Sequence, residues 1–213
     1  ENAIQGLKPR FIHDNVLDYT YDGENAFPAL NEYRMIDTRS LRMGTETTNG
    51  FFMRNDSNHT ILEISVVPSK RRFRTTPDLN GAFAVATFDG FTSGDLDADY
   101  TMVHFELSAP KISPGASLLL VGEAFEYASL ENRLLSYNKD KRVWEKESYI
   151  KQGLIDFMYS QYDAREQSFN SVPLEGSYSE TENDYFMLIY HNRLSDHYTR
   201  LVGYYEYEIG AER

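Results

Sequence analysis

The sequence predicts an all-β protein composed of two tandem immunoglobulin-like β-sandwich domains. Short runs rich in Val, Ile, Phe and Tyr recur along the chain and are separated by turn residues, the pattern of a sandwich. Sixteen Tyr and thirteen Phe occur among the 213 residues, and aromatic side chains favour strands. The stretch from Leu118 to Tyr159 shows the pattern most clearly, with three apolar runs joined by short turns. A helical turn is expected only at Ser129 to Leu134.

The first half of the chain reads as a series of strands and turns. Asp22–Gly23 and Asn80–Gly81 mark turns, and the second pair is a typical hairpin signal. Opposite charges alternate between residues 31 and 42, and we interpret them as structural ion pairs rather than a catalytic cluster. Strands are expected at residues 11–21, 51–53, 61–67, 82–88 and 100–107.

A segment with two prolines and a glycine, residues 109–115, predicts the boundary between the two domains. The first β-sandwich domain would span residues 1–112. The second, residues 113–213, would contain the three strands between Leu118 and Tyr159 and a later pair at residues 185–190 and 201–209. Each domain would then hold about 100 residues, a common domain size.

The charge and composition exclude several classes of function. The formal net charge of -12 disfavours nucleic acid and anionic membranes as partners, because an acidic surface repels phosphate. The chain has no cysteine, which excludes a disulfide scaffold, thiol catalysis and thiolate metal sites. No apolar run approaches the roughly 20 residues of a membrane-spanning helix.

No catalytic motif is present, so we expect neither an enzyme nor a bound cofactor or metal. The sequence lacks a nucleophile elbow, a phosphate-binding loop, a dinucleotide fingerprint and a zinc-protease motif. Asp95, Asp97 and Asp99 resemble the start of a calcium loop, but Tyr100 stands where that loop requires glycine. We therefore predict an acidic turn that leads into a strand.

The aromatic residues offer the best candidates for contacts. Trp144, the only Trp, lies on a predicted strand and is expected in the sandwich core. Tyr127 lies on the bend after Gly122 and is expected to be exposed. An exposed ring of this kind can contact a protein or stack against a sugar.

Six segments of the sequence carry a resemblance to a known family: YDGENAFPALNEYRMIDTRSLRMG, NGAFAV, ADYTMVHFEL, VGEAFEYASLENRLLSYN, IKQGLIDFMY and LEGSYSETENDYFMLIYH. Together they resemble the type IX secretion system plug proteins of Bacteroidota. The resemblance covers residues 11–209, and this chain is similar to the C-terminal portion of the family, without an earlier immunoglobulin-like domain. It implies a non-enzymatic protein of the periplasm, associated with the outer membrane, whose partner is the translocon barrel.

A second resemblance covers residues 116–163, which are similar to glycogen-binding immunoglobulin-like modules. These modules place one Trp on the bend and another after the final strand. Here Tyr127 takes the first position, with Phe125 beside it, and Tyr162 is the nearest candidate for the second. The resemblance therefore keeps a glycan-binding module as the alternative function, with Tyr127, Phe125 and Tyr162 as candidate contacts.

Overall fold

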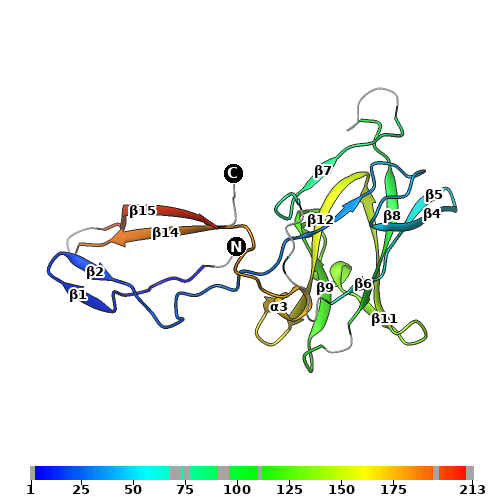
Figure 1. Ribbon diagram of the computed structural model, residues 1–213. Coiled ribbons are helices and arrows are strands. Elements are labelled where there is room, and N and C mark those ends of the chain that lie inside the picture. Colours follow the sequence, from blue (N-terminus) through cyan, green and yellow to red (C-terminus); the bar gives the residue numbers. More distant parts are fainter. Residues whose placement is uncertain are drawn as a thin grey trace.

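The chain is all-β, as predicted, and consists of a β-sandwich and a smaller open lobe (Figure 1). This computed structural model describes residues 3–67, 73, 77–90, 96–109, 112–193 and 197–209. Asp95, the first aspartate of the predicted acidic turn, lies outside these residues, as do four of the five residues of the basic run KRRFR at positions 70–74.

Two sheets form the sandwich. The first has the order β10 (Ser136–Asn138), β11 (Val143–Lys151), β8 (Tyr100–Ser108), β5 (Ser57–Leu62) and β4 (Thr48–Arg54), and β6 (Ser65–Val66) also pairs with β8. The second has the order β13 (Ser168–Asn170), β12 (Gly153–Asp163) and β3 (Arg34–Asp37), and both β7 (Phe83–Val85) and β9 (Ser117–Val121) also pair with β12. Three short helices complete it: α1 (Glu123–Glu126), α2 (Leu130–Arg133) and α3 (Val172–Glu175).

The predicted boundary between residues 112 and 113 is wrong. β8 and β11, from opposite sides of it, pair over eight residues of the first sheet, and β3 pairs with β12 in the second. The two halves therefore share one sandwich. The proline-rich segment instead connects β8 in one sheet to β9 in the other, and a crossing between sheets needs the same turn residues as a linker between domains.

The core lies between the two sheets and follows the alternation of the strands. In β8, Val103, Phe105 and Leu107 have no exposed surface, and they alternate with partly exposed neighbours. Phe105 contacts Phe125 and Phe157 edge-to-face, with ring centroids 5.8 and 5.2 Å away. Burying one such side chain contributes roughly 1.5–3 kcal/mol, so this cluster supplies much of the stability of the sandwich. β8 is the strand predicted at residues 100–107, directly after the acidic turn, and this prediction is confirmed.

The stretch from Leu118 to Tyr159 contains four strands, β9 to β12, where three were predicted, and two short helices. The second helix, α2, lies at the predicted helical turn. Gly122 directly follows β9 and has a φ of 139°. A Cβ there would stand 2.5 Å from the backbone oxygen of Asp156, so the position requires glycine. β11 and β12 do not form a hairpin, because the chain crosses from one sheet to the other at Gln152. That side chain is buried and accepts a hydrogen bond of 2.8 Å from the backbone N–H of Asp99.

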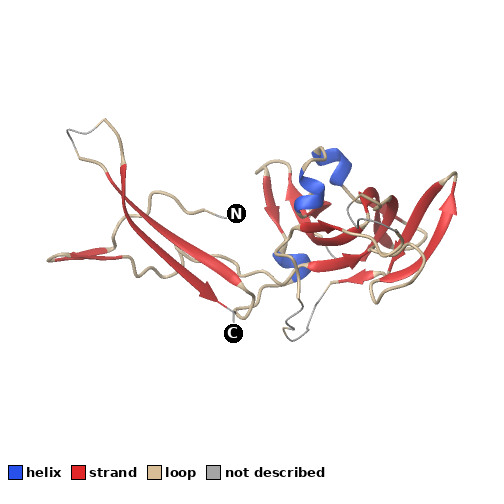
Figure 2. Ribbon diagram, turned by 90° about the horizontal axis from the view of Figure 1, so that it is seen from above, coloured by secondary structure: helices blue, strands red, loops and turns tan. Residues whose placement is uncertain are grey.

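The open lobe contains two hairpins. β1 (Phe11–His13) pairs with β2 (Val16–Asp18), where one longer strand was expected, and β14 (Asn183–His191) pairs with β15 (Arg200–Ile209). The predicted strands at 185–190 and 201–209 exist, but they do not join a second sandwich. No described residue of 3–30 or 182–209 is buried, so the lobe has no core of its own. Figure 2 shows it beside the sandwich.

A buried ion pair lies where the lobe meets the sandwich. The carboxylate of Glu175, only 1% exposed, accepts hydrogen bonds from the Nε of Arg34 at 2.9 and 3.0 Å. The same carboxylate accepts the backbone N–H of Tyr159 at 2.8 Å, and Arg34 also donates to the backbone oxygen of Val66 at 3.1 Å. The pair thus links α3 and β3 to strands in both sheets.

Replacing Glu175 by Ala should lower the free energy of unfolding by about 3 kcal/mol, because it leaves the Arg34 guanidinium without its buried partner. Glu175→Gln should cost less, since the amide oxygen can still accept the N–H of Tyr159. Urea unfolding followed by circular dichroism measures both. A loss below about 1 kcal/mol for Glu175→Ala would show that the pair contributes no more than a surface ion pair.

Candidate functional site

The most prominent exposed apolar surface lies on the β14–β15 hairpin. The register places Phe186 opposite Glu206 and Leu188 opposite Tyr204, so these four side chains share one face. Asp184 and Glu208, which also pair, lie on the same face. We call the face formed by these six residues the open face. Its three apolar members are each about half exposed (Phe186 58%, Leu188 48%, Tyr204 57%). Other exposed apolar residues of the hairpin and its loop are Met187, Tyr190, Tyr198, Leu201, Val202, Tyr205 and Tyr207.

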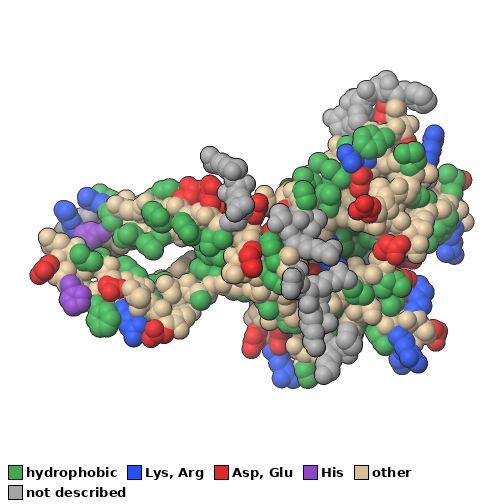
Figure 3. Space-filling model, in the orientation of Figure 1, with side chains coloured by type: hydrophobic (Ala, Val, Ile, Leu, Met, Phe, Trp, Pro, Cys, Tyr) green, Lys and Arg blue, Asp and Glu red, His purple; other side chains and the backbone are tan. Residues whose placement is uncertain are grey.

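The opposite face of the hairpin is turned toward the N-terminal arm, residues 3–28. Tyr185 lies on that face and contacts Phe27, with ring centroids 6.3 Å apart. Apolar side chains also remain exposed on the arm itself, including Phe11, Ile12 and Val16. Figure 3 shows apolar side chains along both parts of the lobe and a hollow between them. The described part of the lobe therefore consists of one long hairpin and an arm with one short hairpin, both with exposed apolar side chains.

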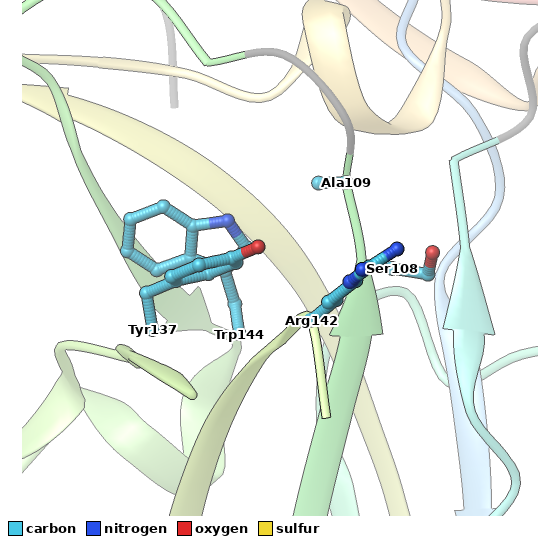
Figure 4. A pocket seen from close by; sticks show the side chains of 5 residues that line it. All are labelled: Ser108, Ala109, Tyr137, Arg142 and Trp144. Carbon is cyan, nitrogen blue, oxygen red and sulfur yellow. The ribbon is translucent and has the colours of Figure 1, made fainter. Parts of the chain in front are cut away.

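An aromatic pocket lies at the edge of the first sheet (Figure 4). Trp144 and Tyr137 line it with ring centroids 5.2 Å apart and planes tilted by 55°, opposite Ser108 and Arg142. Its volume is about 370 Å³. Trp144 is partly buried and packs against the core, so the core prediction holds in part. The rest of its ring surface faces the pocket.

Two histidines and a glutamate form a chain of contacts on the outer face of the first sheet. The Nδ1 of His59 lies 2.9 Å from the Nε2 of His104, and the Nδ1 of His104 lies 3.2 Å from a carboxylate oxygen of Glu147. Phe52 stacks on His59 with a centroid separation of 4.5 Å. Burial lowers the pKa of His104, although the carboxylate of Glu147 opposes that shift. No nucleophilic side chain is hydrogen-bonded to this chain of contacts among the described residues, so it does not form a triad.

The residues predicted as contacts do not come together. Tyr127 is 87% exposed just after α1, as expected for a platform, but no other ring of the described residues stacks on it. Phe125 is 4% exposed and belongs to the core, so its prediction as a contact is wrong: its strand-to-helix bend turns it inward against Phe105. Tyr162 is only partly exposed and packs against Phe169 at 5.1 Å. Because β9 pairs Ser117 with Tyr162 and Val121 with Met158, the two tyrosines lie at opposite ends of that strand.

Sequence reasoning missed two features of the site region. Tyr137 did not stand out, because its contact with Trp144 depends on the pairing of β10 with β11. Asp156 is fully buried, and its Oδ2 accepts the backbone N–H groups of Leu79 and Gly81, which fixes the Asn80–Gly81 turn. Burial raises the pKa of this carboxyl group. Asp156 was missed because its apolar neighbours Ile155 and Phe157 predict a core strand and do not indicate that the carboxyl group between them has a role.

The part of the chain that the structure describes contains no group of three or more His, Cys, Asp or Glu side chains placed to hold a metal ion. Within the same residues, no helix has both the length and the apolar character needed to cross a membrane.

A comparison with solved structures shows that this chain is similar over nearly its whole length to a protein of known crystal structure. It is a hypothetical protein from Parabacteroides merdae ATCC 43184, with a TM-score of 0.79 and 28% sequence identity. The match covers 95% of this chain and 50% of that protein, so this chain spans about half of its length. No protein-family model and no curated protein matches the chain.

The position of His104 predicts that stability falls in mildly acidic solution. Its pKa in the folded protein lies below the ordinary value of 6.5, so the unfolded chain binds a proton more readily. Stability from this residue is complete above about pH 6.5 and declines as the pH falls below it.

In His104→Gln this part of the decline should disappear. Urea unfolding at a series of pH values from about 7.5 to about 5 compares the two proteins over the range in which histidine titrates. Parallel stability curves would rule out the assigned role of His104.

Proposed function

We propose that this protein acts by docking to another protein, without catalysis, and that the β14–β15 hairpin is its docking surface. The observation that carries the proposal is the contrast between the two parts of the chain. The sandwich has a continuous buried core, whereas no described residue of the lobe is buried and many of its aromatic and aliphatic side chains are about half exposed. Extended exposed apolar surface of this kind marks interaction sites.

The resemblance to the plug protein family suggests the partner. On that basis we propose that the protein is periplasmic and associated with the outer membrane. There it would cover the periplasmic mouth of the type IX secretion system translocon barrel. A rigid sandwich with an exposed aromatic arm suits this role, because aromatic residues concentrate binding energy in protein interfaces.

A pull-down tests the proposal. Tagged protein incubated with detergent-solubilised outer membranes of a Bacteroidota species that has the secretion system should recover the barrel, identified by mass spectrometry. Phe186→Ser should reduce recovery more than about ten-fold, because it removes a large apolar side chain from the interface. Tyr127→Ser, on the sandwich, serves as the matched control and should recover as much barrel as the natural protein.

Two outcomes would contradict the proposal in different ways. If the barrel is absent from every eluate, the assigned partner is wrong. If Tyr127→Ser reduces recovery and Phe186→Ser does not, the docking surface lies on the sandwich rather than the hairpin.

The aromatic pocket favours glycan binding as a second candidate function. Trp144 and Tyr137 together present two rings to one hollow, whereas Tyr127 stands alone. Stacking of a sugar on these rings should change the fluorescence of Trp144, the only Trp. Titration with malto- and cello-oligosaccharides should show this change, and Tyr137→Ala should weaken binding by up to about ten-fold. Unchanged emission with both sugars would remove this candidate.

A further inference from the structure

Both edges of the β14–β15 hairpin are free. Within the described residues, β14 pairs only with β15 and β15 only with β14. The two strands are nine and ten residues long, so each presents a row of unpaired backbone N–H and C=O groups. Long free edges readily accept another strand, and a two-stranded hairpin without a third strand has little stability of its own.

The open face has an apolar part and an acidic part. Phe186, Leu188 and Tyr204 occupy the middle of the hairpin. Asp184 lies directly opposite Glu208 near the sandwich, and Glu206 lies next to this pair on the same face. Like charges directly opposite each other destabilise a strand pair. No ion pair among the described residues engages these three carboxylates, although the hydroxyl of Tyr204 donates to Glu206 at 2.5 Å.

We propose that the partner adds a strand to the outer edge of β15. β15 is the favoured edge because it carries Glu206 and Glu208, two of the three acidic residues, beside Tyr204. The added strand would bear apolar side chains at alternate positions to cover Tyr204, and Lys or Arg at the end that lies beside Glu206 and Glu208. Backbone hydrogen bonds would supply affinity, and these side chains would supply selectivity.

This inference rests on the proposed docking function and specifies its mode. It also accounts for the acidic cluster, since a basic residue on the added strand would relieve the repulsion between Asp184 and Glu208. On the other face of the hairpin, Tyr185 already contacts Phe27 of the N-terminal arm.

Synthetic ten-residue peptides provide the test. In each, valine alternates with threonine, and either two lysines or two glutamates stand at one end, with versions for both ends. Fluorescence polarisation of the labelled peptides should show that a lysine peptide binds the protein at least about ten-fold more tightly than its glutamate counterpart. Hydrogen exchange should slow at β15 amides when that peptide is bound.

Matched variants locate the site. Tyr204→Ser should weaken binding of the lysine peptide at least about ten-fold. Tyr149→Ser is the control, because Tyr149 on β11 is 58% exposed and Tyr204 is 57% exposed. The double substitution Glu206→Gln with Glu208→Gln should abolish the preference for lysine over glutamate while leaving the apolar surface intact.

Four results would overturn the inference: no peptide binding, equal binding of both charge types, equal loss in Tyr149→Ser, or a dimer in light scattering that Tyr204→Ser dissociates. The last would assign the edge to a second copy of the chain. Recovery of the barrel without any peptide binding would leave the docking function standing and remove only this mode. Peptide binding without recovery of the barrel would leave strand addition at β15 standing and remove only the assigned partner.

Discussion

The buried ion pair between Arg34 and Glu175 is the interaction on which the arrangement of this protein depends. Glu175 ends α3, the last element before the chain leaves the sandwich, and its carboxylate is held by Arg34 of β3 and by the backbone of Tyr159 in β12. Beyond α3, the backbone oxygen of Leu30 accepts the N–H of Tyr178 at 2.8 Å and the hydroxyl of Thr181 at 3.0 Å. These contacts fix both chain segments that enter the lobe.

The two parts of the molecule then have different energetic roles. Among the described residues, the sandwich holds the buried apolar core, which includes Tyr159, and burial raises the pKa of Tyr159 to about 12. The lobe contributes no buried residue and stays attached through the junction around Leu30 and Glu175. A protein built in this way can present an apolar hairpin without unfolding, because its stability does not depend on the surface that it offers.

The fold class and most strands could be predicted from the sequence, because alternation and turn residues are local signals. β8 appears where the alternating run 100–107 places it, and α2 where the helical turn was expected. The domain boundary failed because proline and glycine mark a chain reversal without saying which sheet follows. The isolation of β14 and β15 could not be predicted, because their apolar runs, such as YFMLIY in β14, are typical of strands buried in a core.

The central claim is that the hairpin, and not the sandwich, meets the partner. Site-specific photocrosslinking in cells tests it most directly, with a photoreactive phenylalanine analogue placed at Tyr204 or at Tyr149, two positions of nearly equal exposure. The account predicts a crosslink to one membrane-associated protein from position 204 and none from position 149. A crosslink from position 149 alone would contradict it.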